Sequence, residues 1–188
     1  MRSTDRMPQI TAEKMTAEQK KAAQEFEAGR GHTPRGPFAV MLRSPEVMLR
    51  AKAMGDYLRF RNVLPKRISE MVILVTAREW TQHYEWFHHY KFAMEAGLAA
   101  ATADAIADAR RPERMDEEEA AAYDFAIELH RRRSVSDSTY ARALAKFGEQ
   151  GVVDLIGLNG YYTFNAMMLN VARTVPEGGA ETLKRLPD

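Results

Sequence analysis

The amino-acid sequence predicts one all-α domain, a single-domain bundle of about eight helices. Apolar residues recur at helical spacing through most of the chain, and Gly, Pro and capping residues separate the segments. No segment has a partner with which it would form a convincing strand pair. The chain has 188 residues, of which 45% are hydrophobic and 28% charged, so it is long enough to bury a core.

Composition excludes several classes of function. The formal net charge of +1 gives no electrostatic reason to expect a nucleic-acid partner. The absence of cysteine excludes disulfides, thiolate metal sites and a thiol nucleophile. The N-terminus has no apolar segment typical of a signal peptide, and no run reaches the roughly 18 apolar residues of a membrane span. We therefore expect a cytoplasmic protein without a membrane partner.

The first third of the chain contains two predicted helices and a loop. Residues 11–29 form the first helix, and Thr16 with Gln19 is a typical capping box. Residues 29–37 are rich in Gly and Pro and form either a plain connector or a loop over a site. The second helix is expected over residues 44–61, because a Ser cap followed by Pro is a typical helix start.

The remaining helices follow at short intervals, and two of them are strongly apolar. The segment that begins at Pro65 is apolar on most sides and is therefore expected to be buried. The last helix is apolar all round, which favours a central position or a subunit interface. Arg131–Arg133 follow a helix end, where the macrodipole favours cations, and form either a solvated end or an anion site. The predicted ranges are 65–79, 81–96, 102–110, 116–130, 136–148 and 150–173.

The stretch from residue 70 to residue 97 places ionisable groups among large apolar side chains. Glu70 shares a helix face with apolar residues, so its carboxylate is expected to be buried and to need a partner. Glu85 and His89 are four residues apart and share a face that continues with apolar residues, whereas His88 is expected to face solvent. Since the two helices are consecutive, we expect Glu70 to contact His89. Such a pair is either an acid–base device or a structural ion pair.

A metal site is an alternative interpretation of the same stretch. Glu85 and His88 form an ExxH half-motif, as in di-iron carboxylate bundles, but the chain has no second copy. Glu79, His83, Glu85 and His89 are the side chains that would hold a single metal ion. We favour a site without a metal, because the lone half-motif is a weak signal.

Several separated pieces of the chain occur in the order found in a known family. They are Ile68–Leu74, Gln82–Glu85, His89 and Ala96–Leu98, together with Pro45–Glu46 and, in the last helix, Gly160–Tyr162, Asn165 and Leu169. In these pieces the chain resembles the carboxymuconolactone decarboxylase family, which includes the alkyl hydroperoxide reductase D-like proteins. The likeness covers residues 36–176, so residues 1–35 are predicted to be an N-terminal extension and residues 177–188 a C-terminal tail.

The resemblance implies an alkyl hydroperoxide reductase D-like fold, a homo-oligomer (trimer or hexamer), and neither a metal nor an organic cofactor. Two cysteine positions of the peroxidase-type members are Gln82 and Glu85 here, which excludes thiol-based hydroperoxide reduction. The positions that match the proton relay are Glu70, Tyr84, Glu85 and His89. The decarboxylase branch also lacks these cysteines, and it acts on a carboxylated, unsaturated lactone from aromatic-acid breakdown.

These observations predict a cofactor-independent acid–base enzyme acting on a small carboxylated lactone or a related aromatic ring-cleavage product. The reaction is expected to be decarboxylation, with lactone hydrolysis or isomerisation as alternatives. The alternatives of another class are a non-catalytic helical oligomer and a metal-dependent helical enzyme. The predicted catalytic residues are Glu70, Glu85 and His89. The predicted substrate-binding residues are Tyr84, Trp86, Tyr162 and Arg35, with Arg61 and Arg67 as further candidates for holding a carboxylate.

Overall fold

The computed structural model describes residues 5–179 and 182–184. This part of the chain contains helices and no β-strand, so the all-α prediction is confirmed. None of the described helices combines the length and the apolar character that crossing a bilayer requires. The α-helices are α1 (Ala17–Arg30), α2 (Pro37–Met41), α3 (Pro45–Phe60), α4 (Lys66–Glu79), α5 (His83–Glu95), α6 (Ala100–Ala107), α7 (Glu117–Arg132) and α8 (Asp137–Ala172), with short 3₁₀ helices η1 (Ala12–Lys14) and η2 (Glu177–Gly179).

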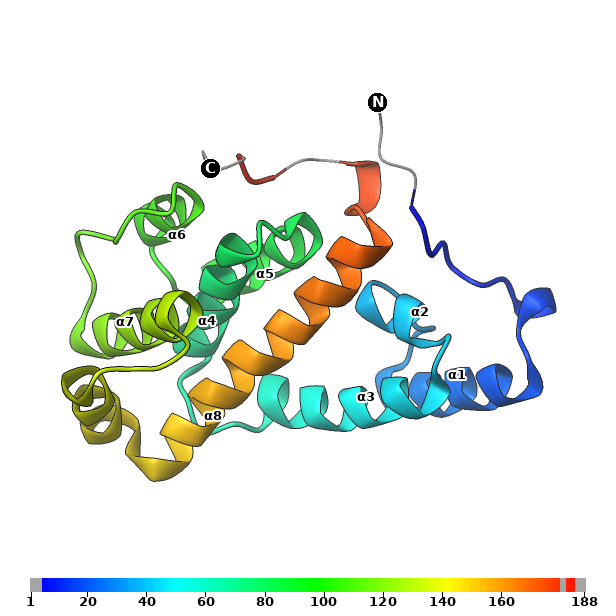
Figure 1. The fold of residues 1–188 in the computed structure, drawn as a ribbon, viewed down its shortest axis with the longest axis horizontal. Coiled ribbons are helices and arrows are strands. Elements are labelled where there is room, and N and C mark those ends of the chain that lie inside the picture. Colours follow the sequence, from blue (N-terminus) through cyan, green and yellow to red (C-terminus); the bar gives the residue numbers. More distant parts are fainter. Residues whose placement is uncertain (1–4, 180–181, 185–188) are drawn as a thin grey trace.

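Helix α4 is the centre of the fold, because every residue from 68 to 78 is buried. Helices α5, α6, α7 and α8 all pack against it (Figure 1). The apolar run in this helix predicts that burial, since a helix that is apolar on most sides has no face to present to water. The buried guanidinium of Arg78 donates hydrogen bonds to the backbone carbonyls of Ala107 and Lys184. These hydrogen bonds join α4 to two other segments, while Arg78 Nε is buried without a hydrogen-bond partner in the described chain.

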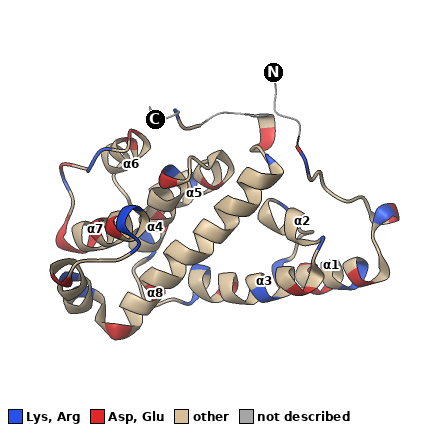
Figure 2. Cartoon of the chain, in the orientation of Figure 1, with Lys and Arg blue, Asp and Glu red and all other residues tan. Residues whose placement is uncertain are grey.

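Helix α8 crosses the molecule between two groups of helices (Figure 1). It packs against α4 and α7 on one side and against α2 and α3 on the other. Gly148 has φ 66° and ψ 178°, which breaks the helix where the sequence predicts one helix to end and another to begin. Figure 2 shows few charged residues along the part of α8 that follows this break. An apolar helix in this position can supply side chains to both halves of the molecule.

Helices α1, α2 and α3 enclose a second, smaller core. It consists of Ala22, Phe26, Phe38, Met41, Leu42 and Met48. The predicted capping box is present at the start of α1, where Gln19 N–H donates to the Thr16 hydroxyl at 3.2 Å. Extended backbone at Met15 and Thr16 divides the predicted first helix into η1 and α1. Helix α2, which directly follows the loop, was not predicted. The proposed tail, residues 177–188, lies partly outside the described residues.

The turn between α4 and α5 determines how these two helices meet. Thr81 has a positive φ of 46°, and the Gln82 side chain accepts a hydrogen bond from Tyr84 N–H, which starts α5. Helix α5 then returns along α4. As a result, Glu70 near the start of α4 lies beside His89 on α5, as the sequence predicts.

Candidate active site

A buried acid–imidazole pair joins α4 to α5. His89 Nδ1 lies 2.6 Å from Glu70 Oε2, and the side chains are 5% and 0% exposed. An ionised carboxylate can only accept hydrogen bonds, so Nδ1 carries a proton and donates it. This orientation leaves His89 Nε2 as the ring atom that can exchange a proton with a ligand.

The surroundings of Glu70 keep its carboxylate ionised. Burial alone would raise the pKa of Glu70, but the hydrogen bond and charge of His89, together with Lys66, lower that pKa below its ordinary value. Lys66 Nζ lies 2.6 Å from Glu70 Oε1, one helical turn earlier on α4, and about half of the lysine side chain is exposed. The negative charge therefore lies where it accepts the Nδ1–H hydrogen bond and orients the imidazole.

Glu85 lies on the other side of the same imidazole. Its Oε2 is 3.5 Å from His89 Nε2, and Oε1 is buried without a hydrogen-bond partner among the described residues. Burial raises the pKa of Glu85, and the opposing effects of His89 and Arg59 do not cancel this rise. The pKa values of the two acids beside His89 are thus shifted in opposite directions: that of Glu70 is lowered and that of Glu85 is raised. Carboxyl groups with pKa values shifted in opposite directions are typical of acid–base sites.

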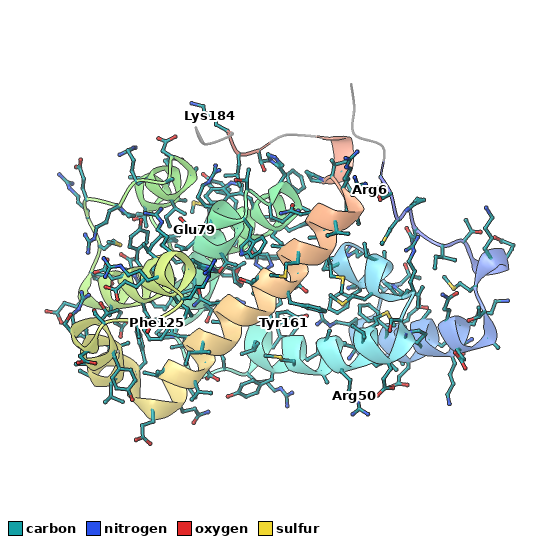
Figure 3. All side chains as sticks on the ribbon, viewed as in Figure 1. Arg6, Arg50, Glu79, Phe125, Tyr161 and Lys184 are labelled. Atoms are coloured by element: carbon teal, nitrogen blue, oxygen red, sulfur yellow. The ribbon has the colours of Figure 1, made fainter. Side chains whose placement is uncertain are left out.

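The Glu85–His89 side of this array opens on a pocket of about 120 Å³. An engineered apolar cavity of about 150 Å³ binds benzene, so this volume suits a ligand the size of one ring. Figure 3 labels Tyr161 on α8, and its hydroxyl lies against Gly55 of α3, a contact that leaves no room for a larger residue than glycine. The pocket is lined by Tyr84, Glu85, His88, His89 and Phe92 from α5, Tyr161, Tyr162 and Asn165 from α8, Gly55 and Arg59 from α3, and Arg30, His32, Arg35, Pro37 and Phe38 from the N-terminal part.

Tyrosine hydroxyls supply neutral hydrogen-bond donors to the pocket. Burial raises the pKa of Tyr84 and of Tyr161 to about 12 and that of Tyr162 well above its ordinary value, so all three phenols are protonated near neutral pH. The ring of Tyr162 lies edge-on to His89, with the ring centroids 5.0 Å apart. The predicted positions of Tyr84 and Tyr162 in the pocket agree with the structure.

The loop before α2 approaches Tyr84 closely and places Arg35 at the pocket. Gly36 has φ 57°, and a Cβ atom at that position would lie 2.6 Å from the Tyr84 ring. Glycine is therefore required both by its backbone conformation and by the close contact. Arg35 precedes it and is exposed at the edge of the pocket. The loop thus belongs to the site, as the second interpretation of residues 29–37 proposes.

The two other arginines that the sequence offers for a substrate carboxylate lie elsewhere. Arg67 pairs with Asp116 at 2.8 Å and with Glu119, both at the start of α7. Arg61 lies against the Tyr57 ring and does not line this pocket. Of the three candidate arginines, Arg35 lines the pocket, and Arg30 and Arg59 line it as well.

Two expectations for residues of α5 are wrong, and one for the arginines that end α7 is confirmed. Trp86 does not line the pocket, because it is 5% exposed and packs in the main core. His88, expected to face solvent, is half-buried and lines the pocket, stacked against Tyr84 with ring centroids 4.3 Å apart. Arg131, Arg132 and Arg133 are exposed, as the solvated-end interpretation predicts, and Arg131 also forms a two-pronged ion pair with Glu79.

The metal interpretation receives no support from the described residues. His83 Nδ1 accepts hydrogen bonds from the backbone N–H groups of Thr182 and Leu183, so it is a packed histidine. Glu79 is engaged by Arg131. Across residues 5–179 and 182–184, no three His, Asp or Glu side chains converge as metal ligands would.

His32 lines the pocket together with Arg35, as the loop-over-a-site interpretation of residues 29–37 expects, whereas sequence reasoning assigned no role in the site to several other lining residues: Phe38, Gly55, Arg59, Phe92, Tyr161 and Asn165. One available signal was the isolated Gly55 inside a predicted helix, because such a glycine often marks a close approach of another element. Arg59 lies one helical turn after it, on the same face. Phe92 continues the Glu85–His89 face of α5, and Tyr161 and Asn165 belong to the last-helix pieces that carry the family resemblance, whereas Phe38 comes from a segment that only the fold brings to the pocket.

Two solved structures of the debrominase Bmp8 have a similar fold. The apo structure aligns with a TM-score of 0.69 and 11% identity, over 92% of this chain and 92% of the debrominase. A cysteine-to-alanine variant in complex with 2,3,4-tribromopyrrole aligns with a TM-score of 0.71 and 12% identity, over 94% of each chain. At this identity the likeness shows a common fold. No family model and no curated protein matches the chain.

Proposed function

We propose that this protein is a cofactor-independent acid–base enzyme acting on a small carboxylated lactone or a related product of aromatic ring cleavage. The observation that carries the proposal is the buried Glu70–His89–Glu85 array, whose Glu85 and His89 line a pocket of single-ring size. An oriented imidazole between two carboxyl groups whose pKa values are shifted in opposite directions can both accept and return a proton. The resemblance to the carboxymuconolactone decarboxylase family, stated from the sequence, supports the choice of substrate class.

In the proposed decarboxylation, the bond between a ring carbon and its carboxylate breaks and CO₂ leaves. The electron pair passes into the unsaturated lactone, where a neutral tyrosine hydroxyl of the pocket, such as that of Tyr162, can donate a hydrogen bond to the oxygen that gains charge. The proton held between Glu85 and His89 Nε2 then moves to the ring carbon, and a proton taken up from solvent replaces it, so each turnover consumes one proton and releases one CO₂. Glu70 touches no substrate atom in this scheme and acts by orienting His89. Lactone hydrolysis or isomerisation would use the same groups.

The fold comparison supports an enzyme that acts on small molecules, because a debrominase with this fold has been solved with a tribromopyrrole bound. That complex contains a variant in which alanine replaces a cysteine, whereas the present chain has no cysteine. A step that depends on a thiol is therefore chemically excluded here. We therefore propose a small planar ligand, as in the debrominase complex, and assign the chemistry to the Glu70–His89–Glu85 array.

A non-catalytic helical oligomer is the second candidate. It is favoured by apolar side chains that α8 exposes, because exposed apolar surface often marks a contact between subunits. Val153, Ile156 and Val171 are 64%, 49% and 57% exposed. In that case the Glu70–His89 pair would only hold α4 against α5. A homo-oligomer is also compatible with the enzyme, so the oligomeric state does not discriminate between the two.

A substrate screen on His89→Gln tests the proposal. Carboxylated lactones, muconate-like diacids and phenolic acids are screened by thermal shift and then assayed for turnover, using wild type, His89→Gln and the control Arg61→Gln. We expect a lactone that wild type and the control convert, with turnover by His89→Gln lower by a factor on the order of 10²–10⁴. Equal turnover by folded His89→Gln would contradict the assignment.

A further inference from the structure

The pocket carries positive charge that no acid in the described chain neutralises. Three arginines line it, and Arg30 is paired with Asp56 at 2.6 Å. Neither Arg35 nor Arg59 forms an ion pair with a carboxylate within residues 5–179 and 182–184. Glu85 is the acid that lines the pocket, and burial raises its pKa although the charge of Arg59 opposes the rise. The pocket is therefore suited to a ligand that brings its own negative charge.

Arg59 is held by stacking and not by an acid. Its guanidinium carbon lies 4.8 Å from the centroid of the Phe92 ring and 5.3 Å from that of Phe60. Its Nε atom is buried and has no hydrogen-bond partner in the described chain. Stacking on aromatic rings fixes the plane of a guanidinium and leaves its N–H groups for a ligand. A buried donor without a partner costs free energy, which a bound acceptor would recover.

His88 supplies a second unpaired group in the same pocket. Its Nε2 atom is buried without a hydrogen-bond partner among the described residues, and its ring is held between Tyr84 and Phe87. Burial lowers the pKa of His88, and the charges of Arg35 and Arg59 lower it further, while Glu177 opposes them. A neutral imidazole can donate one hydrogen bond to an anion or accept one from a protonated group. His88 is also adjacent in sequence to His89, so an anion here lies beside the acid–base array.

We propose that Arg59, His88 and Arg35 form a carboxylate subsite, which orients a small planar carboxylate toward His89 and Glu85. A guanidinium matches the two oxygens of a carboxylate through two parallel hydrogen bonds, which fixes the orientation of the ligand as well as binding it. The aromatic walls formed by Phe92 and Tyr162 favour a flat, unsaturated body. Turnover of such a ligand rests on the proposed function, whereas its binding does not.

The test uses binding of benzoate, with benzamide as an uncharged ligand of the same shape. Titration calorimetry on the full chain compares wild type, Arg59→Gln, Arg59→Lys and the control Arg61→Gln, which alters an arginine outside the pocket. We expect wild type and the control to bind benzoate about tenfold or more tightly than benzamide, since charged hydrogen bonds are the strong ones. Arg59→Gln should abolish this preference, and Arg59→Lys should restore part of it because it keeps the charge but loses the planar fork.

Glu70→Gln separates this inference from the proposed function. Glu70 does not line the pocket, so the variant should bind benzoate as wild type does even though its turnover is expected to fall. Benzoate selectivity with no lactone turnover by any variant would refute the proposed function and leave the subsite intact. Absence of benzoate binding, equal affinity for benzamide, or full selectivity in Arg59→Gln would each overturn the subsite.

Discussion

Replacing Glu70 with glutamine is the most informative single change in this protein. The amide has nearly the shape of the carboxylate and keeps an oxygen that can accept the hydrogen bond from His89 Nδ1, 2.6 Å away in the wild type. It removes the negative charge that faces both His89 and Lys66. The substitution therefore leaves the packing almost unchanged and tests the electrostatic contribution of Glu70.

The expected loss of stability follows from the burial of the pair. Breaking a buried ion pair by removing one partner costs about 3–5 kcal/mol. The amide keeps one hydrogen bond, and the Lys66 side chain is 48% exposed and can turn to water, so we expect a loss of about 1–3 kcal/mol. For a chain of this size each kcal/mol lowers Tm by about 2–4 °C, which gives a decrease of about 2–12 °C.

The effect on activity separates a catalytic role from a structural one. Without the negative charge beside Nδ1–H, the His89 imidazole is held less firmly in its orientation, and kcat on the identified substrate should fall by a factor on the order of 10²–10⁴. Kinetics and thermal unfolding are measured together, well below the Tm of the variant. Glu79→Gln is the matched control, because Glu79 lies on the same helix and pairs with a half-exposed Arg131, so its removal should cost at most about 1 kcal/mol and leave kcat unchanged. A folded Glu70→Gln protein with wild-type kcat would refute the reasoning.

Three further measurements test the same site and the loop that borders it. The pKa of Glu85 is raised from 4.5 by folding, so its contribution to stability is fully present below pH 4.5 and is lost as pH rises through the folded-state pKa. Glutamine does not titrate, so chemical denaturation should show Glu85→Gln gaining stability relative to wild type as pH rises. A difference in stability that does not depend on pH would contradict this expectation. The pKa of Glu70 is lowered, so its contribution to stability is present above pH 4.5 and is lost as pH falls through the folded-state pKa. Glu70→Gln should therefore lose less stability in acid than wild type does. In Gly36→Ala the new Cβ atom would sit at a positive φ and against the Tyr84 ring. Urea unfolding should therefore show a loss of stability of about 1–3 kcal/mol, and benzoate should bind more weakly. Unchanged stability and binding would show that the loop can shift freely.

The sequence predicts most of the elements because their signals are local. Capping residues, Pro and Gly mark the ends of α1, α3 and α7, and Gly148 marks the break in α8. The short helix α2 was missed because five residues carry too little helical pattern to be recognised. The division of the first predicted helix at Met15 was missed for a similar reason, since a capping box marks a start but does not exclude a preceding turn.

Local sequence patterns predict part of the candidate site, and the packing of distant segments determines the rest. Residue spacing alone places Glu85 and His89 on one helix face, and the apolar surroundings of Glu70 require a buried partner for it. The adjacent helices then make the Glu70–His89 contact predictable. The roles proposed for these residues remain predictions, because the geometry shows their proximity and not a reaction.

Spacing could not predict which face of α5 meets the core and which meets the pocket. Trp86 and His88 are two residues apart and both carry aromatic rings, yet the first packs in the core and the second lines the pocket. Their placement depends on where α8 and the loop before α2 close over α5. The partners of Arg67 could not be predicted from spacing either, because the acids that form ion pairs with it lie about fifty residues further along the chain, at the start of α7.

The sequence by itself determined the helical class, the absence of thiol chemistry and the acid–imidazole spacing, because periodicity, composition and i,i+4 neighbours are properties of a single segment. The tertiary structure alone decided that Arg35, Arg59 and His88 share one pocket and that Arg61 and Arg67 lie outside it. These residues come from different elements of the chain, and their distances depend on helix packing and chain reversals that no local pattern encodes.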